Sequence, residues 1–193
     1  MRTKKNELRR QVLARRDLVS PAEAHAAAEA VARAGMALVQ ERLAPGATIS
    51  AYWPMRSEIG TRPLMELLTA KGYRTALPVT HKAGEPLTFR LWTTGDDLAH
   101  GRLGIEEPLA TAEEAIPDVL YVPLAAFDAR GGRIGYGAGH FDATIAALRA
   151  QRPTIAVGLG YDLQEIDAVP LEGHDERLDF IITETRTLAT GER

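Results

Sequence analysis

The chain has 193 residues, a length that suits a single domain able to bury a substantial hydrophobic core. Its formal net charge of −3 argues against bulk binding of nucleic acid, and the absence of cysteine excludes disulfides, thiolate metal sites and cysteine nucleophiles. No apolar run is long enough to cross a membrane, and the N-terminus is followed by a charged segment rather than by the apolar core of a signal peptide. We therefore expect a cytoplasmic protein without a membrane partner.

Residues 1–19 are expected to form a basic N-terminal helix, with one narrow apolar stripe made by Leu8, Val12 and Leu13. The basic side chains in question are those of Lys4, Lys5, Arg9 and Arg10. On the pattern alone, a solvated helix surface is the better interpretation of these charges. Contact of a few of them with a phosphate is the alternative.

A second helix start is well marked. Ser20 is expected as the N-cap, Pro21 occupies the first helical position, and Glu23 completes a capping box. The alanine-rich helix should then run to about Leu43 and end before Pro45-Gly46, packing closely against another layer through its small side chains.

Strands and helices alternate along the rest of the chain. We expect strands at 48–53, 73–79, 87–92, 118–123, 154–159 and 178–183, and helices at 61–68 and 141–150. The segment 98–109 is interrupted by glycine and is expected to be irregular, and 184–193 is expected as a short tail. This alternation predicts one α/β domain over residues 1–193, a three-layer α/β/α sandwich with a mostly parallel sheet.

A glycine loop, residues 130–142, lies between the strand at 118–123 and the next helix, and it has five glycines within nine residues. Such a loop can turn backbone N–H groups toward an anion at the start of a helix, and phosphate is the obvious anion. The alternative is a flexible surface turn. The loop also contains Arg130, Arg133, His140 and Asp142, which suit phosphate contact or metal binding. It matches neither the P-loop nor the dinucleotide fingerprint.

Three further places in the sequence are candidates for ligand or metal binding, and each also has a purely structural interpretation. Glu58 follows the strand at 48–53, where open α/β sheets bind ligands, and a simple loop carboxylate is an equal alternative. His174-Asp175 is more often a capped turn than a metal site. Trp92 suits the core better than a flat wall for an aromatic ligand.

Several stretches together resemble the 5-formyltetrahydrofolate cyclo-ligase family, and they cover nearly the whole chain in the family's order. They are Lys5-Asn-Glu-Leu-Arg9, Tyr52-Trp-Pro54 with Glu58, Leu77-Pro78, Gly104-Ile-Glu-Glu-Pro108, Val122-Pro123 with Ala126-Phe-Asp128, the run from Gly132 to Asp142, and His174-Asp175. The Gly-Arg-Ile-Gly-Tyr-Gly core, with an aromatic residue and Asp142 after it, is the most specific of these motifs.

The resemblance implies a reaction in which ATP and Mg²⁺ drive closure of 5-formyltetrahydrofolate to 5,10-methenyltetrahydrofolate, releasing ADP and phosphate. A formamide carbonyl is a poor electrophile. The implied mechanism therefore transfers the γ-phosphoryl group to the formyl oxygen before the folate nitrogen at position 10 attacks. Positioning and charge neutralisation supply most of the catalysis in such a transfer.

The resemblance also implies roles for individual residues. Residues expected to contact ATP are Lys5, Arg9, Arg133, Ile134, Gly135, Tyr136, Gly137, Ala138, Gly139, His140 and Phe141. Residues expected to contact the reduced folate are Tyr52, Glu58, Trp92, Tyr136, Gly137, Ala138, Gly139, His140 and Phe141. Asp142 and Asp175 are the expected Mg²⁺ ligands, and the expected catalytic residues are Arg133, His140 and Asp142. A monomer is expected, with a weak dimer as the alternative.

The chain departs from the family's pattern inside the glycine loop. Ala138 stands where glycine or lysine is common, His140 and Phe141 replace a usual Tyr-Tyr pair, and Ala143 replaces a frequent basic residue. Two alternatives to the cyclo-ligase stay open at this point. One, which this departure motivates, is a folate- or nucleotide-binding regulator without catalysis. The other, which the glycine loop alone would permit, is a kinase-like phosphotransferase on another small molecule.

Overall fold

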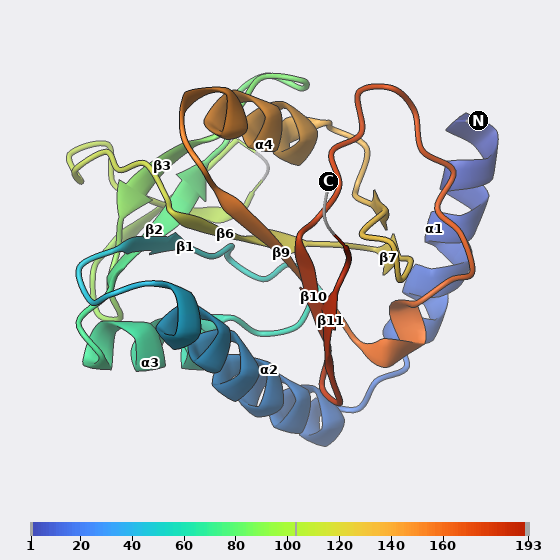
Figure 1. The fold of residues 1–193 in the computed structure, drawn as a ribbon, viewed down its shortest axis with the longest axis horizontal. Helices are drawn as coiled ribbons and strands as arrows, with labels where there is room; N and C mark the ends of the chain where they lie inside the picture. Colours follow the sequence, from blue (N-terminus) through green and yellow to red (C-terminus); the bar gives the residue numbers. More distant parts are fainter. Residues whose placement is uncertain (1, 103, 192–193) are drawn as a thin grey trace.

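The computed structural model describes residues 2–102 and 104–191 as a mixed α/β domain built on a seven-stranded sheet (Figure 1). The strands, in chain order, are β1 (Thr48–Ser50), β2 (Arg74–Val79), β3 (Thr88–Leu91), β6 (Val119–Pro123), β9 (Ile155–Leu159), β10 (Phe180–Ile182) and β11 (Thr187–Ala189). Their spatial order is β11-β10-β9-β6-β1-β2-β3. The five inner strands are parallel, and the edge strands β11 and β3 are antiparallel to their neighbours. The expected mostly parallel sheet is confirmed.

Helices cover both faces of this sheet. Helices α2 (Pro21–Arg42) and α3 (Arg62–Ala70) lie together on one face, and α4 (His140–Gln151) lies on the other (Figure 1). Helix α1 (Arg2–Arg16) stands at the side of the sheet, against the 3₁₀ turn η1 (Asp162–Gln164) and strand β7 (Ala126–Phe127). The three-layer sandwich is therefore confirmed. Among the described residues, no helix combines the length and the apolar character needed to cross a bilayer.

The predicted capping box of α2 is confirmed. Ser20 Oγ accepts from Glu23 N at 3.3 Å, Glu23 Oε2 accepts from Ser20 N at 2.9 Å, and the helix is capped at its other end by Leu43. Close packing against the sheet is also observed, because the Tyr121 hydroxyl donates to Gly35 O at 2.8 Å and a Cβ at Gly35 would lie 3.0 Å from that hydroxyl.

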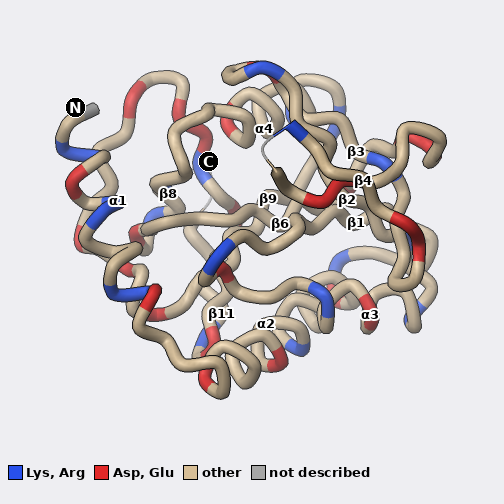
Figure 2. Tube along the Cα trace, turned by 180° about the vertical axis from the view of Figure 1, so that it is seen from behind, with Lys and Arg blue, Asp and Glu red and all other residues tan. Residues whose placement is uncertain are grey.

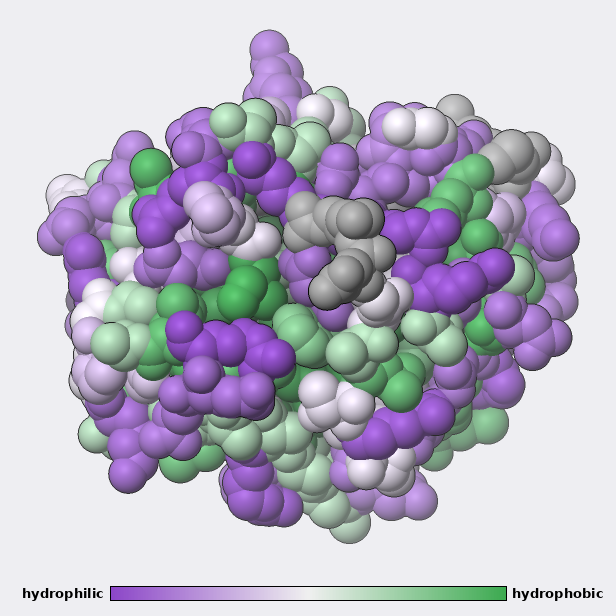
Figure 3. All heavy atoms as spheres, viewed as in Figure 1, coloured by the Kyte–Doolittle hydropathy of each residue, from purple (hydrophilic) through white to green (hydrophobic). Residues whose placement is uncertain are grey.

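The sheet separates two hydrophobic clusters. Strand β6 contributes Val119 and Tyr121 to the cluster under α2 and α3, and Leu120 and Val122 to the cluster under α4. All four residues are buried, which explains why this strand is a continuous apolar run rather than an alternating one. The outer surface is polar over most of the face seen in Figure 3, with apolar side chains showing in small groups.

Two segments differ from expectation. The prediction that 98–109 is irregular is wrong, because β4 (Leu98–His100) and β5 (Glu106–Pro108) form an antiparallel hairpin. Each strand has three residues, Leu-Ala-His in β4 and Glu-Glu-Pro in β5, and neither shows an alternating apolar pattern, so no strand signal was available. The segment 184–193 contributes edge strand β11 at Thr187–Ala189, while its last residues, 192–193, lie outside the described part of the chain.

Candidate functional site

A cavity of about 640 Å³ opens at the carboxyl ends of β1 and β6. The chain runs from β1 outward to β2 and β3, whereas β6 starts a run in the opposite direction to β9 and β10. Ligands of open α/β sheets bind at such a reversal of strand order. Most of the cavity wall comes from five segments, which are residues 5–9, 52–58, 105–107, 133–142 and 172–175, and the rest comes from Pro78, Thr80, Leu87 and Pro123.

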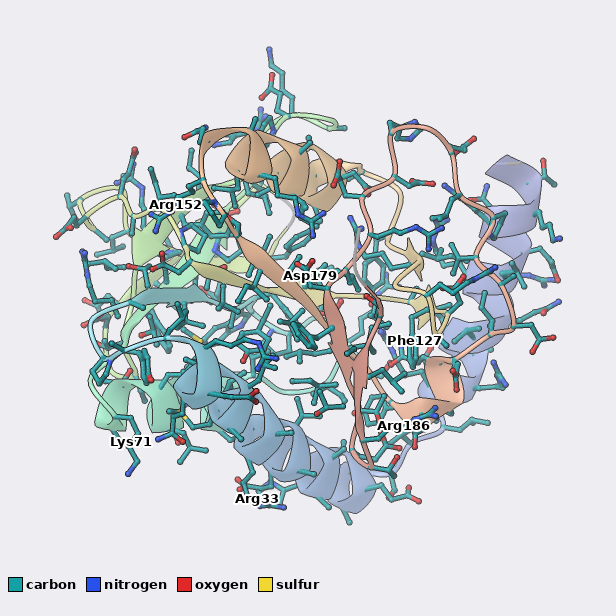
Figure 4. All side chains as sticks on the ribbon, in the orientation of Figure 1. Arg33, Lys71, Phe127, Arg152, Asp179 and Arg186 are labelled. Carbon is teal, nitrogen blue, oxygen red and sulfur yellow. The ribbon has the colours of Figure 1, made fainter. Side chains whose placement is uncertain are left out.

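The glycine loop forms one wall of this cavity, and the predicted order of strand, loop and helix is confirmed. Strand β8 (Arg133–Ile134) lies within the loop and pairs with β7, the strand just before it, which contacts α1. The fully buried Phe127 of β7 packs in the cluster under α4 (Figure 4). Gly137 and Gly139 then have positive φ angles of 98° and 73°, and α4 begins at the next residue. The first turn of a helix leaves N–H groups without helical partners, so this loop presents donors for an anion.

Helix α1 brings two of the predicted basic residues to the loop. Arg9 Nε donates to Gly135 O at 2.6 Å, and Lys5 Nζ donates to Glu172 Oε2 at 3.0 Å and to Asp175. Burial acts to lower the pKa of Lys5, but the two carboxylates outweigh it and raise the pKa above its ordinary value. Lys4 and Arg10 stay exposed, on a helix whose trace carries both basic and acidic positions in Figure 2. The solvated interpretation therefore fits these two residues and not Lys5 or Arg9.

Arg133 and Asp142 close the loop at its base. The buried Arg133 donates from Nη2 to Asp142 Oδ1 at 2.8 Å and from Nη1 to Glu176 O at 2.6 Å, while Glu176 N also donates to Asp142 Oδ1 at 3.0 Å. Burial lowers the pKa of Arg133, and the charge of Asp142 opposes that change. Arg133 thus orients Asp142 and has partners within the protein.

Glu58 lies in another part of the cavity wall, in the segment that follows β1. Its Oε2 accepts from Met55 N at 2.7 Å, whereas its buried Oε1 has no hydrogen-bond partner among the described residues. Burial raises the pKa of Glu58, and the Met55 N–H, the Tyr136 hydroxyl and the charge of Arg16 act against that rise. A buried carboxylate oxygen without a donor is costly, so this site suits a ligand with N–H groups.

Of the two aromatic residues predicted as walls for the folate, the structure brings Tyr52 to the cavity and not Trp92. Tyr52 lines the cavity, and its hydroxyl donates to Ile59 O at 3.2 Å. Trp92 is in the core with 3% exposure and donates from Nε1 to Asp96 O at 3.1 Å, so the structure does not bring it to the cavity. Trp53 lines the cavity instead and meets Trp92 edge to face, with ring centroids 5.7 Å apart. Its position between Tyr52 and Pro54 was the available signal.

His140 is the first residue of α4 and lines the cavity. Its Nδ1 lies 3.0 Å from Glu85 O. A carbonyl oxygen only accepts, so Nδ1 carries the hydrogen and the other ring nitrogen, Nε2, has no proton in the neutral ring. Phe141 also lines the cavity and packs against the cluster under α4.

The acidic residues of the cavity offer hard oxygen ligands. Asp175 groups with Glu172 and His174, whose candidate ligand atoms all lie within 4.8 Å of one another. Asp142 lies outside that group but lines the same cavity, and its Oδ2 has no hydrogen bond among the described residues. Carboxylate oxygens are the ligands that Mg²⁺ prefers, so Asp142, Asp175 and the unpredicted Glu172 fit that ion, and the exposed His174 does not.

The β4–β5 hairpin adds a side chain whose role the sequence did not give. Glu107 is buried in the cavity wall and accepts from Thr80 N at 2.9 Å and from the Thr80 hydroxyl. A Cβ at Gly101 would lie 2.2 Å from Glu107 Cδ, so only glycine leaves room for this carboxylate. The motif from Gly104 to Pro108 was visible in the sequence, but its register with Thr80 was not.

The chain is similar to characterised proteins over most of its length. A family model described as the 5-formyltetrahydrofolate cyclo-ligase family matches residues 1–184. The 5-formyltetrahydrofolate cyclo-ligase of Haemophilus influenzae is 28% identical over 184 residues, covering 93% of this chain and 97% of the relative. The Escherichia coli K12 protein of the same name is 34% identical over 145 residues, covering 72% and 79%.

Two solved structures share the fold. A 5,10-methenyltetrahydrofolate synthetase from Mycoplasma pneumoniae superposes with a TM-score of 0.75 at 22% identity, covering 93% of this chain and 98% of the other. The Aquifex aeolicus 5,10-methenyltetrahydrofolate synthetase gives a TM-score of 0.74 at 24% identity, covering 98% and 94%. Together, the family match and the curated relatives show that this chain belongs to the 5-formyltetrahydrofolate cyclo-ligase family, a family of ligases.

Proposed function

We propose that the protein catalyses the ATP- and Mg²⁺-dependent cyclisation of 5-formyltetrahydrofolate to 5,10-methenyltetrahydrofolate, with release of ADP and phosphate. One observation carries the proposal beyond family membership. A single cavity has donors for phosphate in its glycine loop and α1 wall, and a buried carboxylate oxygen without a donor at Glu58. These two features match the two substrates of the reaction.

In this proposal, ATP binds along the glycine loop. The N–H groups at the start of α4 and the side chains of Lys5 and Arg9 face the phosphates. Lys5 and Arg9 are anchored on α1 by contacts to 172–175 and to Gly135, so their charges are held in place before the nucleotide arrives. Such pre-positioned charge is the main contribution of a protein to phosphoryl transfer.

In this proposal, Asp142 and Asp175 would hold Mg²⁺, and Glu172 lines the same cavity. When bound, the ion neutralises charge on the phosphate oxygens. Arg133 fixes the Asp142 carboxylate by binding its Oδ1, which leaves Oδ2 for the ion. Lys5 and the Glu172 N–H fix Asp175 in the same way through Oδ2.

The reduced folate binds at the other wall. Glu58 accepts hydrogen bonds from neighbouring N–H groups of the pterin, a pairing that suits a carboxylate geometrically. Tyr52, Trp53 and Tyr136 supply aromatic surface around it. In this proposal the formyl group lies near the glycine loop, so that the loop's N–H groups are close to the transferring phosphoryl group.

The chemistry proceeds in two steps. The formyl oxygen attacks the γ-phosphorus of ATP, the bond to the β-phosphate oxygen breaks, and ADP leaves. The nitrogen at position 10 then attacks the formyl carbon, the C–O bond breaks, phosphate leaves with the electron pair, and that nitrogen loses its proton to give the methenyl product. We further propose that the protein acts as a cytoplasmic monomer without a nucleic-acid partner.

The deciding experiment is a cyclisation assay on the purified protein. With MgATP and 5-formyltetrahydrofolate, the methenyl product should appear by its absorbance, with one ADP and one phosphate formed for each product. Activity should disappear without ATP or with a chelator. Folded protein that gives no product would overturn the proposal. Tight binding of folate without turnover would favour a regulator in its place, a function that the His140-Phe141 replacement makes worth testing.

A further inference from the structure

Arg16, the last residue of α1, is buried with 1% exposure, although its neighbour Arg15 is exposed. Arg16 is also absent from the cavity wall. A charged side chain is seldom enclosed without a specific set of partners, because removing it from water is costly. Arg16 therefore has a role that a surface arginine of the same helix does not share.

The partners of Arg16 come from two walls of the cavity. Its Nη1 donates to the Tyr136 hydroxyl at 2.7 Å, and its Nε donates to Ser57 Oγ at 3.0 Å. The guanidinium carbon also lies 5.9 Å from the centroid of the Tyr136 ring. Ser57 in turn donates to Asp17, so the end of α1 holds this segment through two successive residues. One buried cation thereby joins α1, the segment after β1 and the glycine loop.

Glu58 lies next to this junction. Three groups surround its carboxylate from different elements, namely Arg16 on α1, Tyr136 on the glycine loop and Tyr52 after β1. The two tyrosines are neutral at physiological pH, since burial raises the pKa of each hydroxyl. Arg16 is thus the one cation among these three groups, and its charge opposes the effect of burial on Glu58.

We propose that Arg16 is a positioning residue for the reduced folate, which holds Tyr136 and the 55–58 segment so that Glu58 meets the pterin as an oriented carboxylate. This inference rests on the proposed function. Arg16 touches neither substrate, and its effect on folate binding passes through Tyr136, Ser57 and Glu58. ATP recognition should depend on it far less, because Lys5 is held by Glu172 and Arg9 by Gly135 O, and neither bond involves Arg16.

The test uses calorimetric binding of 5-formyltetrahydrofolate without ATP, together with steady-state kinetics. In Arg16→Met, affinity for the folate should fall roughly tenfold to a hundredfold, the usual effect of losing hydrogen bonds to a charged group. The KM for ATP should stay within about twofold. Arg15→Met is the matched control on the exposed side of the same turn and should bind both substrates like the wild type.

A pH profile distinguishes positioning from a general loss of structure. Without the Arg16 charge, the acidic limb of folate binding should move to higher pH, because Glu58 then holds its proton more strongly. Arg16→Lys keeps the charge, so the acidic limb of its folate binding should stay close to the pH of the wild-type limb, although its affinity for the folate should be lower. In the combined variant of Arg16→Met and Tyr136→Phe, the loss should be smaller than the sum of the single losses, since the two residues share one hydrogen bond.

The outcomes separate the two proposals. Wild-type protein that binds no reduced folate would overturn the proposed function and this inference with it. Wild-type binding that Arg16→Met leaves unchanged would overturn the inference alone. Equal loss of ATP and folate affinity in a folded Arg16→Met and Arg16→Lys would also overturn it, because that result indicates a structural role without selectivity.

Discussion

Arg133 and Asp142 stand nine positions apart and are joined across the base of the glycine loop, with Arg133 Nη2 donating to Asp142 Oδ1 at 2.8 Å. The pair has two consequences that can be separated by mutation. Asp142 supplies the acceptor for a buried guanidinium, and in the proposed reaction it supplies charge to Mg²⁺. An amide in place of the carboxylate keeps the acceptor for Arg133, although without the charge that opposes its burial, and removes the charge supplied to Mg²⁺.

We therefore expect Asp142→Asn to fold like the wild type, since the amide oxygen can still accept from Arg133 and from Glu176 N. Its kcat at saturating ATP should fall roughly a hundredfold or more, because an amide oxygen binds the ion far less well than a carboxylate. Asp142→Ala should show the same loss of turnover and, in addition, a free energy of unfolding lower by about 1–3 kcal/mol, since Arg133 loses its acceptor. Kinetics across Mg²⁺ concentrations and urea unfolding measure the two effects. Near-wild-type kcat of Asp142→Asn at saturating Mg²⁺ would contradict the metal role.

Gly139 allows a test of the loop's backbone. Its φ is 73°, and a Cβ there would meet no atom nearer than Gly84 Cα at 3.8 Å, so Gly139→Ala strains the backbone without a clash. Stability should fall by about 1–2 kcal/mol, the usual penalty for a left-handed L-residue. The KM for ATP should rise several-fold, because the N–H groups at the start of α4 would be re-aimed.

Gly135→Ala is the matched control in the same loop. Gly135 has an ordinary φ, and its added Cβ would have no neighbour within 4 Å among the described atoms. Its free energy of unfolding should match the wild type within about 0.5 kcal/mol. If both alanine variants unfold at the same urea concentration, the backbone of Gly139 does not require glycine.

Trp53 and Trp92 give opposite expectations for fluorescence. Trp53 lines the cavity, whereas Trp92 lies behind it in the core. Binding of reduced folate should therefore quench the wild type and Trp92→Phe, and it should leave the emission of Trp53→Phe almost unchanged. Quenching retained in Trp53→Phe and lost in Trp92→Phe would restore Trp92 as the folate contact expected from the sequence.

Some elements could be predicted because their signals are local. The capping box at Ser20 and Glu23 and the strand, loop and helix around Gly135 depend on residues close together in the chain. The fold class follows from the alternation of such elements. Strand β11 was not recognisable, since its three residues have no pattern of their own and become a strand by pairing with β10.

The site residues could be predicted where they lie within one sequence motif, and could not be predicted where packing brings distant segments together. Asp142 and His140 lie in the glycine loop itself, so the resemblance indicated them directly. Trp53 and Trp92 are both apolar and both follow strands, and only the packing of β1 and β3 decides which of them reaches the cavity. Arg16 gave no signal, because nothing in α1 distinguishes its buried arginine from the exposed Arg15.

Glu58 carries the pH dependence that we expect for folate binding. Burial raises its pKa above the ordinary value of 4.5, and the ligand's N–H groups need the ionised carboxylate. Affinity for the reduced folate should thus be full above the Glu58 pKa and decline as the pH falls through it, starting at a higher pH than a solvated glutamate would give. Calorimetric titrations over a pH series measure this limb.

Glu58→Gln removes the titrating group but keeps the shape and one acceptor oxygen. Its folate affinity should be roughly tenfold to a hundredfold lower at neutral pH, since a charged acceptor is replaced by a neutral one, and the acidic limb should be absent. Glu66→Gln on the exposed side of α3 is the control and should keep both the affinity and the limb. Because Lys5 and Arg9 lie in a different wall of the cavity, the KM for ATP should be unaffected. A change confined to ATP affinity would reverse the assignment of Glu58 and place the folate elsewhere in the cavity.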